Sequence, residues 1–344
     1  MTNEMNTRST MMKKDYRNVS HLIPAAFDMI GQKAVGETSS EVLKNAKMDF
    51  KIGTEPLYDS KGNELKSKFM RIFREDTNQT LSVMTKTYNV LQNYELIGIA
   101  DKLIPSGDVD FDRIGMVNNG ERLFVSFQTP DSYTFANGNV DETLESYFYL
   151  VNSNDGSGGV KIVPAPRRLF CKNQASLLEG FLRRIGIDPK MLVIRHSSLM
   201  RGKIDELVTA LGLVNQAIEQ FAVESQQLLT TEMTVGDRTE YYIDTLGLKV
   251  EEELISGDNP YGLGTRGKNT LEQLIEIEGY ERNNIGVMNN TRYQAYNVVT
   301  DYIDHRWTVD KSGKINEKRV ESAIIGPKAR TKSKAWETLI QMEL

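Results

Sequence analysis

The sequence is poor in the residues that form disulfides and zinc sites. Its 344 residues include one cysteine, Cys171, and three histidines, His21, His196 and His305. A single cysteine excludes an intramolecular disulfide, and no neighbouring motif supplies a base to activate its thiol, so we expect Cys171 to be a packing residue. No Cys/His group has the spacing of a zinc site. We therefore expect no metal or other cofactor, and a reducing cytoplasm as the compartment.

Long apolar runs are also absent. No stretch approaches the roughly 18 apolar residues that mark a membrane-spanning helix, so no membrane association is expected. Residues 1–20 are polar and mixed in charge, without the apolar core of a secretory signal. We interpret residues 1–24 as a flexible N-terminal arm.

Signatures of catalysis are few. The sequence shows no Ser–His–Asp arrangement, paired carboxylates or dinucleotide fingerprint. The stretch 262–269 is close to a phosphate-binding loop, but Asn269 follows its lysine where that loop requires Ser or Thr. Asp301 and His305 lie one helical turn apart and can form an ion pair or half a metal site. A structural role is the stronger interpretation, and an enzyme using either feature is the weakest alternative.

Positive charge is concentrated in one segment. The chain carries 42 Lys and Arg against 47 Asp and Glu, a net charge of −5. Residues 160–203 hold ten of the basic residues and two acids, a net of +8, which leaves −13 on the other 300 residues. Such segregation suits a surface that holds a polyanion; the alternative is an incidentally basic, solvated helix–loop region. A second basic run lies at 328–334, where a track for nucleic acid and a solvated helix start are both compatible with the pattern.

Hydrophobic patterning predicts an α+β fold, in which an antiparallel β-meander has helices packed on one face and is followed by a long helix and a helical C-terminal region. We divide the chain into the arm, an α+β core at 25–230 that includes the basic segment, and a mainly helical region at 231–344 after a Gly-rich loop. The predicted hairpins lie at 68–88 and 113–127, with further strands at 146–152 and 159–163. The predicted helices lie at 39–46, 93–103, 173–184, 196–229, 270–278, 291–305 and 329–342.

The basic segment begins where the last strand is expected to pass into a helix. Asn173 is the predicted N-cap of that helix. Arg167, Arg168 and Lys172 would then lie at the junction, where the first N–H groups of the helix add to the attraction for phosphate.

The run from Leu150 to Asn173, which contains Asn152-Ser-Asn-Asp-Gly156 and Arg167-Arg-Leu-Phe-Cys171, resembles the signature of the phage/plasmid-like proteins catalogued as a domain of unknown function. Other segments of the chain resemble segments of that family and occur in the same order as they do there, so the likeness covers about residues 25–342. These segments are 46–52, 88–93, 195–196, 296–305 and 319–326. Lys172 stands where that family often has glutamine. The resemblance implies a mobile-element protein in a bacterial cytoplasm, and it supplies no established activity or catalytic residue.

The layout is also similar, more distantly, to the core of the single-strand annealing recombinases of phages, which hold single-stranded DNA in a basic groove and form rings or filaments. Together with the charge segregation, this predicts a non-catalytic protein of phage homologous recombination that binds and anneals single-stranded DNA. The residues predicted to contact phosphates are Lys161, Arg167, Arg168, Lys172, Arg183, Arg184, Arg195, Arg201 and Lys203, and those predicted to stack on bases are Tyr147, Tyr149 and Phe170.

The expected partners are single-stranded DNA and further copies of the chain in a ring or filament, with a host or phage single-strand binding protein or nuclease as a further candidate. The alternative is a phage or plasmid protein that binds and modulates a host defence or replication protein through the basic segment.

Overall fold

The computed structural model describes residues 26–98, 101, 109–137, 140–169, 173, 175–197, 211–284, 288–310 and 312–342. The predicted arm at 1–24 lies outside these ranges, as do Phe170, Lys172, Arg201 and Lys203 of the predicted site. Within the described ranges, every helix is too short or too polar to cross a bilayer.

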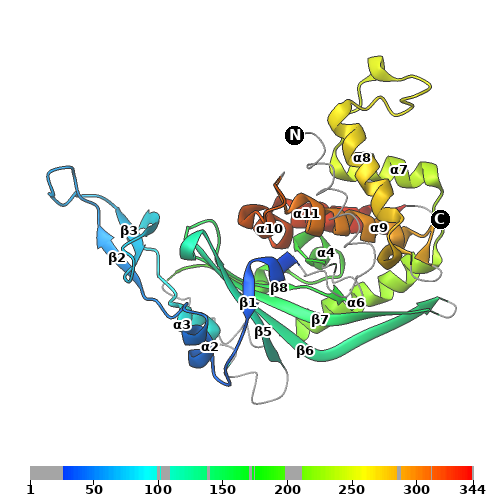
Figure 1. Cartoon of the computed structure of the whole chain (residues 1–344). Coiled ribbons are helices and arrows are strands. Elements are labelled where there is room, and N and C mark those ends of the chain that lie inside the picture. The colour runs from blue at the N-terminus through cyan, green and yellow to red at the C-terminus, as the bar shows by residue number, and fades with distance from the viewer. Residues whose placement is uncertain are drawn as a thin grey trace.

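An antiparallel sheet of seven strands forms the centre of the molecule (Figure 1). Its order is β1-β5-β6-β7-β8-β10, and β9 pairs with β7. The consecutive pairing of β5 to β8 confirms the predicted meander and the α+β class. The strands are β1 (Gly31–Lys33), β5 (Asp110–Val117), β6 (Arg122–Asn137), β7 (Val140–Ser153), β8 (Val160–Pro164), β9 (Arg167–Arg168) and β10 (Val193–Ile194).

The β5–β6 turn shows why its hairpin was predictable. Asn118, Asn119 and Gly120 all adopt positive φ angles, of 50°, 56° and 112°, which Asn and Gly tolerate best. β6 and β7 extend well beyond the predicted strands, with a register shift between Gln128 and Ser132. The sequence missed this extension because its residues are largely polar.

Side chains of the sheet alternate between two hydrophobic clusters, because successive residues of a strand face opposite sides. Val125 and Leu150 pack in the larger cluster with Phe221 of helix α6 (Leu211–Thr230). Phe124 and Tyr149 pack in the smaller one, with the short helix η2 (Ala26–Met29) and helix α10 (Glu317–Ile324). Both faces of the sheet are therefore covered.

The C-terminal part is helical, as predicted. Trp336 of α11 stacks on Phe221 of α6 at 4.1 Å between ring centroids, so this part packs directly on the layer that covers the sheet. The domain boundary at 230/231 remains a prediction. The elements are α7 (Val235–Leu246), α8 (Thr265–Glu278), α9 (Arg292–Asp301), the π-helix η10 (Tyr302–Trp307), α10 (Glu317–Ile324) and α11 (Pro327–Gln341).

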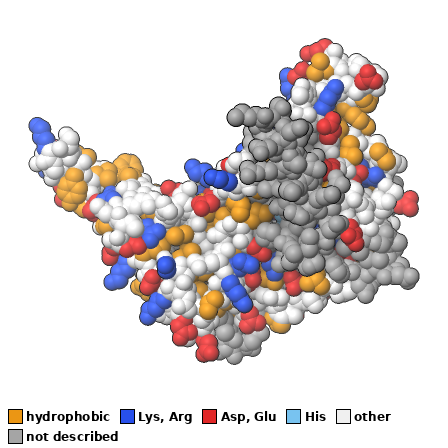
Figure 2. All heavy atoms as spheres, in the orientation of Figure 1, with side chains coloured by type: hydrophobic (Ala, Val, Ile, Leu, Met, Phe, Trp, Pro, Cys, Tyr) orange, Lys and Arg blue, Asp and Glu red, His pale blue; other side chains and the backbone are white. Residues whose placement is uncertain are grey.

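A second, three-stranded sheet projects from one side of the molecule (Figure 1). It contains the predicted hairpin at 68–88 and is preceded by α2 (Ser39–Asn45) and followed by α3 (Asn93–Ile97). Figure 2 shows apolar side chains gathered over this projection, whereas Lys and Arg are interspersed with Asp and Glu elsewhere on that face. The strands are β2 (Ile52–Pro56), β3 (Phe69–Arg74) and β4 (Thr80–Thr85).

Candidate nucleic-acid interface

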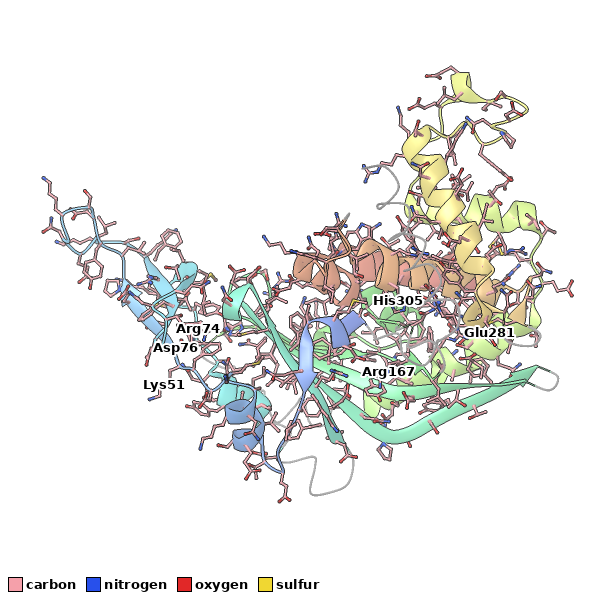
Figure 3. The ribbon with its side chains drawn as sticks, in the orientation of Figure 1. Lys51, Arg74, Asp76, Arg167, Glu281 and His305 are labelled. Carbon is pink, nitrogen blue, oxygen red and sulfur yellow. The ribbon has the colours of Figure 1, made fainter. Side chains whose placement is uncertain are left out.

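Arg167 and Arg168 are buried, and their predicted contact with phosphates is wrong. They form strand β9, paired with β7, and their side chains point to opposite faces of the sheet. Arg167 lies on the side of Tyr147 and Asp28 (Figure 3), and Arg168 lies on the side of Asn283 and Tyr293. The Arg168 guanidinium donates to both carboxylate oxygens of Glu142 at 2.7 Å. Arg167 lies 3.7 Å from the Tyr147 ring centroid and 3.4 Å from the Glu145 carboxylate. Their charge is therefore neutralised inside the protein.

The predicted base-stacking tyrosines are buried as well. Tyr147 is 3% exposed and Tyr149 is 1% exposed. Tyr149 packs on Phe27, with 5.0 Å between ring centroids, and the Arg167 guanidinium covers Tyr147. Neither ring can accept a base, so this prediction is wrong for both.

Asn173 does not cap a helix. Helix α4 (Glu179–Arg184) begins six residues later, with Leu178 at its N-cap. The Asn173 side chain instead donates to the Asn297 carbonyl and contacts Nε2 of His305 at 3.1 Å. The predicted cluster of cations at a helix start is therefore absent from the described part of this junction.

Arg184 also forms an ion pair with a carboxylate. Its guanidinium donates to both oxygens of Glu224 at 2.6 and 2.7 Å. Burial alone would raise the pKa of Glu224, but hydrogen bonds from Arg184 and Trp336 outweigh burial and hold that pKa below its ordinary value. Arg184 therefore joins α4 to α6 and is unsuited to bind phosphate.

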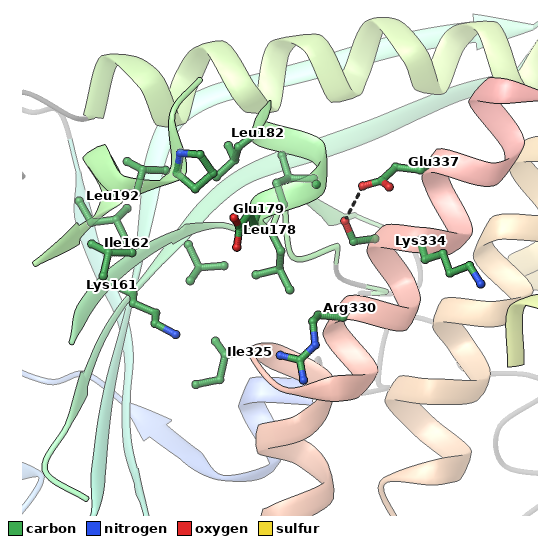
Figure 4. Close-up of a pocket in the computed structure, with 16 residues that line it drawn as sticks. Lys161, Ile162, Leu178, Glu179, Leu182, Leu192, Ile325, Arg330, Lys334 and Glu337 are labelled. Carbon is green, nitrogen blue, oxygen red and sulfur yellow. Dashed lines mark hydrogen bonds between the residues drawn. The ribbon is translucent and has the colours of Figure 1, made fainter. Parts of the chain in front are cut away.

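The other described basic side chains of residues 160–203 line a groove on another part of the surface. Its first part is a pocket of about 340 Å³ between β8, α4 and α11. Lys161 of β8 and Arg330 of α11 extend into this space from opposite sides, and Lys334 lies at its rim with its ammonium directed away from the pocket (Figure 4). The apolar wall is made by Ile162, Leu182 and Leu192.

A second pocket of about 680 Å³ adjoins the first. Glu179, Pro189 and Val193 line both pockets, so the two adjoin at these residues, and together they are here called the basic groove. Its second part is lined by the remaining basic residues, Arg183, Lys190 and Arg195.

Most cations of the basic groove lack a carboxylate partner. Among the described residues, the only ion pair made by a groove cation joins Arg183 to Glu179, at 2.7 Å on an exposed face. The other acid, Glu337, accepts a hydrogen bond from Ser333 (Figure 4). Burial, and next the charges of Arg122 and Arg330, lower the pKa of Lys161. A bound anion would relieve this repulsion. The unpaired cations are Lys161, Lys190, Arg195, Arg330 and Lys334.

Arg330 and Lys334 were missing from the predicted site. They belong to the basic run at 328–334, and the fold brings them beside Lys161 although about half the chain separates them in sequence. A lone basic run gives no hint of such a partner, so only the tertiary structure identifies these two residues as part of the groove. Lys332 of the same run is buried and pairs with Asp304 at 2.8 Å.

Asp301 and His305 have structural partners. Asp301 is fully buried and accepts hydrogen bonds at 2.5 and 2.7 Å from the Arg282 guanidinium. His305 lies among the C-terminal helices (Figure 3), and burial lowers its pKa. In the described part of the chain, His, Cys, Asp and Glu form no group of three or more that could hold a metal ion.

Comparison with known proteins gives a family and nothing beyond it. No curated protein matches the chain, and no solved structure matches it. A family model with the description "Domain of unknown function (DUF932)" matches residues 80–332. This match spans most of the chain and includes the seven-stranded sheet except β1, helix α4, the basic groove except Ser333, Lys334 and Glu337, and most of the helical region. The chain therefore belongs to the DUF932 family.

Proposed function

We propose that this protein binds the phosphate backbone of single-stranded DNA in the basic groove and anneals complementary strands without catalysis. The observation that carries the proposal is the groove itself, in which five unpaired cations from β8, η6 (Pro189–Leu192), the end of β10 and α11 line two adjoining pockets. Unpaired cations gathered in a depression favour a polyanion, and the acidic remainder of the chain disfavours attachment elsewhere.

The walls of the groove favour a single strand over a duplex. The half-buried side chains of Leu178, Val193 and Ile325 give the groove accessible apolar surface between the cations. Unpaired bases can pack on such a surface, whereas a duplex keeps its base faces stacked inside. This arrangement replaces the predicted stacking on Tyr147 and Tyr149.

The test removes three groove charges at exposed positions, in the variant Lys190→Gln/Arg195→Gln/Arg330→Gln. Its control, Lys33→Gln/Lys44→Gln/Lys51→Gln, removes three exposed lysines elsewhere and changes the net charge equally. We expect the groove variant to bind a labelled oligonucleotide at least about tenfold more weakly, because each lost ionic contact is worth roughly 0.5 kcal/mol or more. Fluorescence anisotropy over a salt series should also show a slope smaller by about 2, at ~0.7 per phosphate contact.

Equal binding by the two variants would refute the proposal. So would an affinity of the unmodified protein that stays constant from low to high salt. A strand-annealing assay with complementary oligonucleotides then tests the second step, and the groove variant should lose annealing together with binding.

The alternative occupant of the groove is an acidic segment of a host defence or replication protein. Pull-down from nuclease-treated host lysate separates the two ideas. A partner recovered through the groove residues, with no oligonucleotide binding, would support the alternative and contradict the proposal.

The proposal includes self-assembly into a ring or filament in the bacterial cytoplasm. It rests on the resemblance to mobile-element proteins and, more distantly, to annealing recombinases. Particle images with and without single-stranded DNA test it directly.

A further inference from the structure

A third pocket, whose lining residues are remote in sequence from the basic segment, lies where helix α8 begins. Its volume is about 600 Å³. The walls come from the end of α7 and the connection after it, from the first turn of α8, from η10 and from the start of α11. The basic residues that line it are Lys249, Arg266 and Lys328, and the aromatic ones are Tyr302 and Trp307.

Two of these three cations line the pocket without forming an ion pair with a carboxylate. Lys249 pairs with Glu251 at 2.7 Å. Arg266 and Lys328 make no ion pair among the residues that the structure describes. Burial, and next the positive charge of Arg266, lower the pKa of Lys328. Two like charges are therefore held together beside a cavity large enough for a small molecule.

The backbone adds donors to the same wall. Gly264, Thr265, Arg266 and Gly267 line the pocket, and Gly264 caps α8 without a side-chain hydrogen bond. The first N–H groups of a helix have no partner inside the helix, and no acidic side chain occupies this first turn. These donors supplement Arg266 and Lys328.

The aromatic wall belongs to an uncommon element. Tyr302 and Trp307 are the two ends of the π-helix η10, and π-helices are rare and frequent at functional sites. The Lys328 ammonium lies 5.4 Å from the Trp307 ring centroid. A cation and a flat ring thus meet on one side of the cavity.

We propose that this pocket binds a nucleotide, with its phosphates on Arg266, Lys328 and the first turn of α8, and its base against Trp307. The pocket is distinct from the basic groove, so the inference is independent of the proposed DNA binding. Hydrolysis is not part of it. Lys268, the lysine of the loop-like motif, does not line the pocket, and helix α8 already begins at Thr265, inside that motif.

The test is calorimetric titration of the full-length protein with ADP and, separately, with inorganic pyrophosphate. We expect Arg266→Gln and Lys328→Gln each to weaken ADP binding about tenfold or more, because each removes a charge-assisted hydrogen bond to a phosphate oxygen. The matched control is Lys268→Gln, which removes an exposed charge from the same helix and should leave the affinity unchanged. Arg266 is exposed, so its substitution should not disturb folding, which a thermal unfolding curve verifies.

Absence of binding by both ligands at millimolar concentration would overturn the proposal, as would an equal loss in the Lys268→Gln variant. Pyrophosphate binding as tight as ADP binding would overturn the base contact at Trp307. The groove variant Lys190→Gln/Arg195→Gln/Arg330→Gln should still bind ADP, which keeps this result separate from the test of DNA binding.

Discussion

Arg168 is part of a buried polar network that joins the sheet to the helical layer. Its guanidinium binds Glu142 of β7 and also donates to the Arg282 carbonyl at 3.2 Å. Arg282 in turn holds Asp301 of α9. Buried charges of this kind must be paired, because removal of one partner leaves the other desolvated and unsatisfied.

We therefore expect Arg168→Met to lower the free energy of unfolding by about 3 kcal/mol, because it leaves the Glu142 carboxylate buried and unpaired. The double variant Arg168→Met/Glu142→Leu should recover a large part of this loss. Arg183→Met is the control, since its pair with Glu179 is exposed to solvent and its loss should change the stability little. Urea unfolding measures all three, and a loss below about 1 kcal/mol for Arg168→Met would contradict the assignment.

The basic residues of segment 160–203 are evident from the sequence, but whether each of them is buried or exposed could not be predicted from it. The partners of Arg168 lie in β7 and about 115 residues further along, near Asn283. Glu142 belongs to the part of β7 that patterning missed, so no carboxylate was expected opposite Arg168. Lys161, Arg183 and Arg195, by contrast, do line a groove. Lys161 lies in β8, Arg195 directly follows β10, and Arg183 is on the solvent side of α4.

At the level of elements, the basic groove depends on the close approach of β10 to β8. Val193 and Ile194 pair with Lys161 and Val160, and Arg195 follows directly. A Cβ atom on Gly159 would lie 2.1 Å from the Ile194 carbonyl oxygen. Only glycine at this position allows the two strands to lie so close.

Gly159→Ala should therefore displace β10, lower the stability by about 1–3 kcal/mol through overpacking, and weaken oligonucleotide binding because Arg195 moves with the strand. The neighbouring Gly158→Ala is the control, since its Cβ would meet nothing closer than 3.4 Å. Thermal unfolding and anisotropy measure the two effects. If Gly159→Ala matches Gly158→Ala in both, the groove does not depend on this contact.

Local signals explain which elements were predictable. The turn at residues 118–120 and the alternation on either side determined the β5–β6 hairpin from sequence alone. The N-terminus of α7 carried a readable capping box between Thr234 and Asp237, which patterning overlooked. Asn173 has the right residue type for an N-cap, but its amide bonds to α9 and η10 instead. Tertiary contacts thus overrode a local preference.

On the scale of the whole molecule, acidic and basic residues have separate roles. The chain has a net charge of −5, and many arginines are used internally against carboxylates. The groove and the pocket at α8 each gather cations without a carboxylate partner in a depression. A polyanion approaching an acidic protein is then directed toward these two places, which favours an oriented complex over diffuse attachment.

The projecting sheet exposes apolar side chains on one of its faces. The register Phe69↔Thr85 and Arg71↔Val83 places Phe69 and Val83 on one face, where they are 38% and 51% exposed. Ile72 on the other face is fully buried. An apolar face on a projecting element is typical of an interaction surface.

If the proposed assembly uses this face, Phe69→Ser/Val83→Thr should reduce the assembled fraction seen by mass photometry, with and without oligonucleotide, because it removes apolar area from the contact. Thr retains the strand preference at position 83, and circular dichroism should confirm that the fold is unchanged. Tyr94→Ser is the control, since Tyr94 is 62% exposed on α3 outside the sheet and should leave the masses unaffected. Identical mass distributions for the double variant and the unmodified protein would exclude this face as the contact, and any assembly would then have to form through another surface.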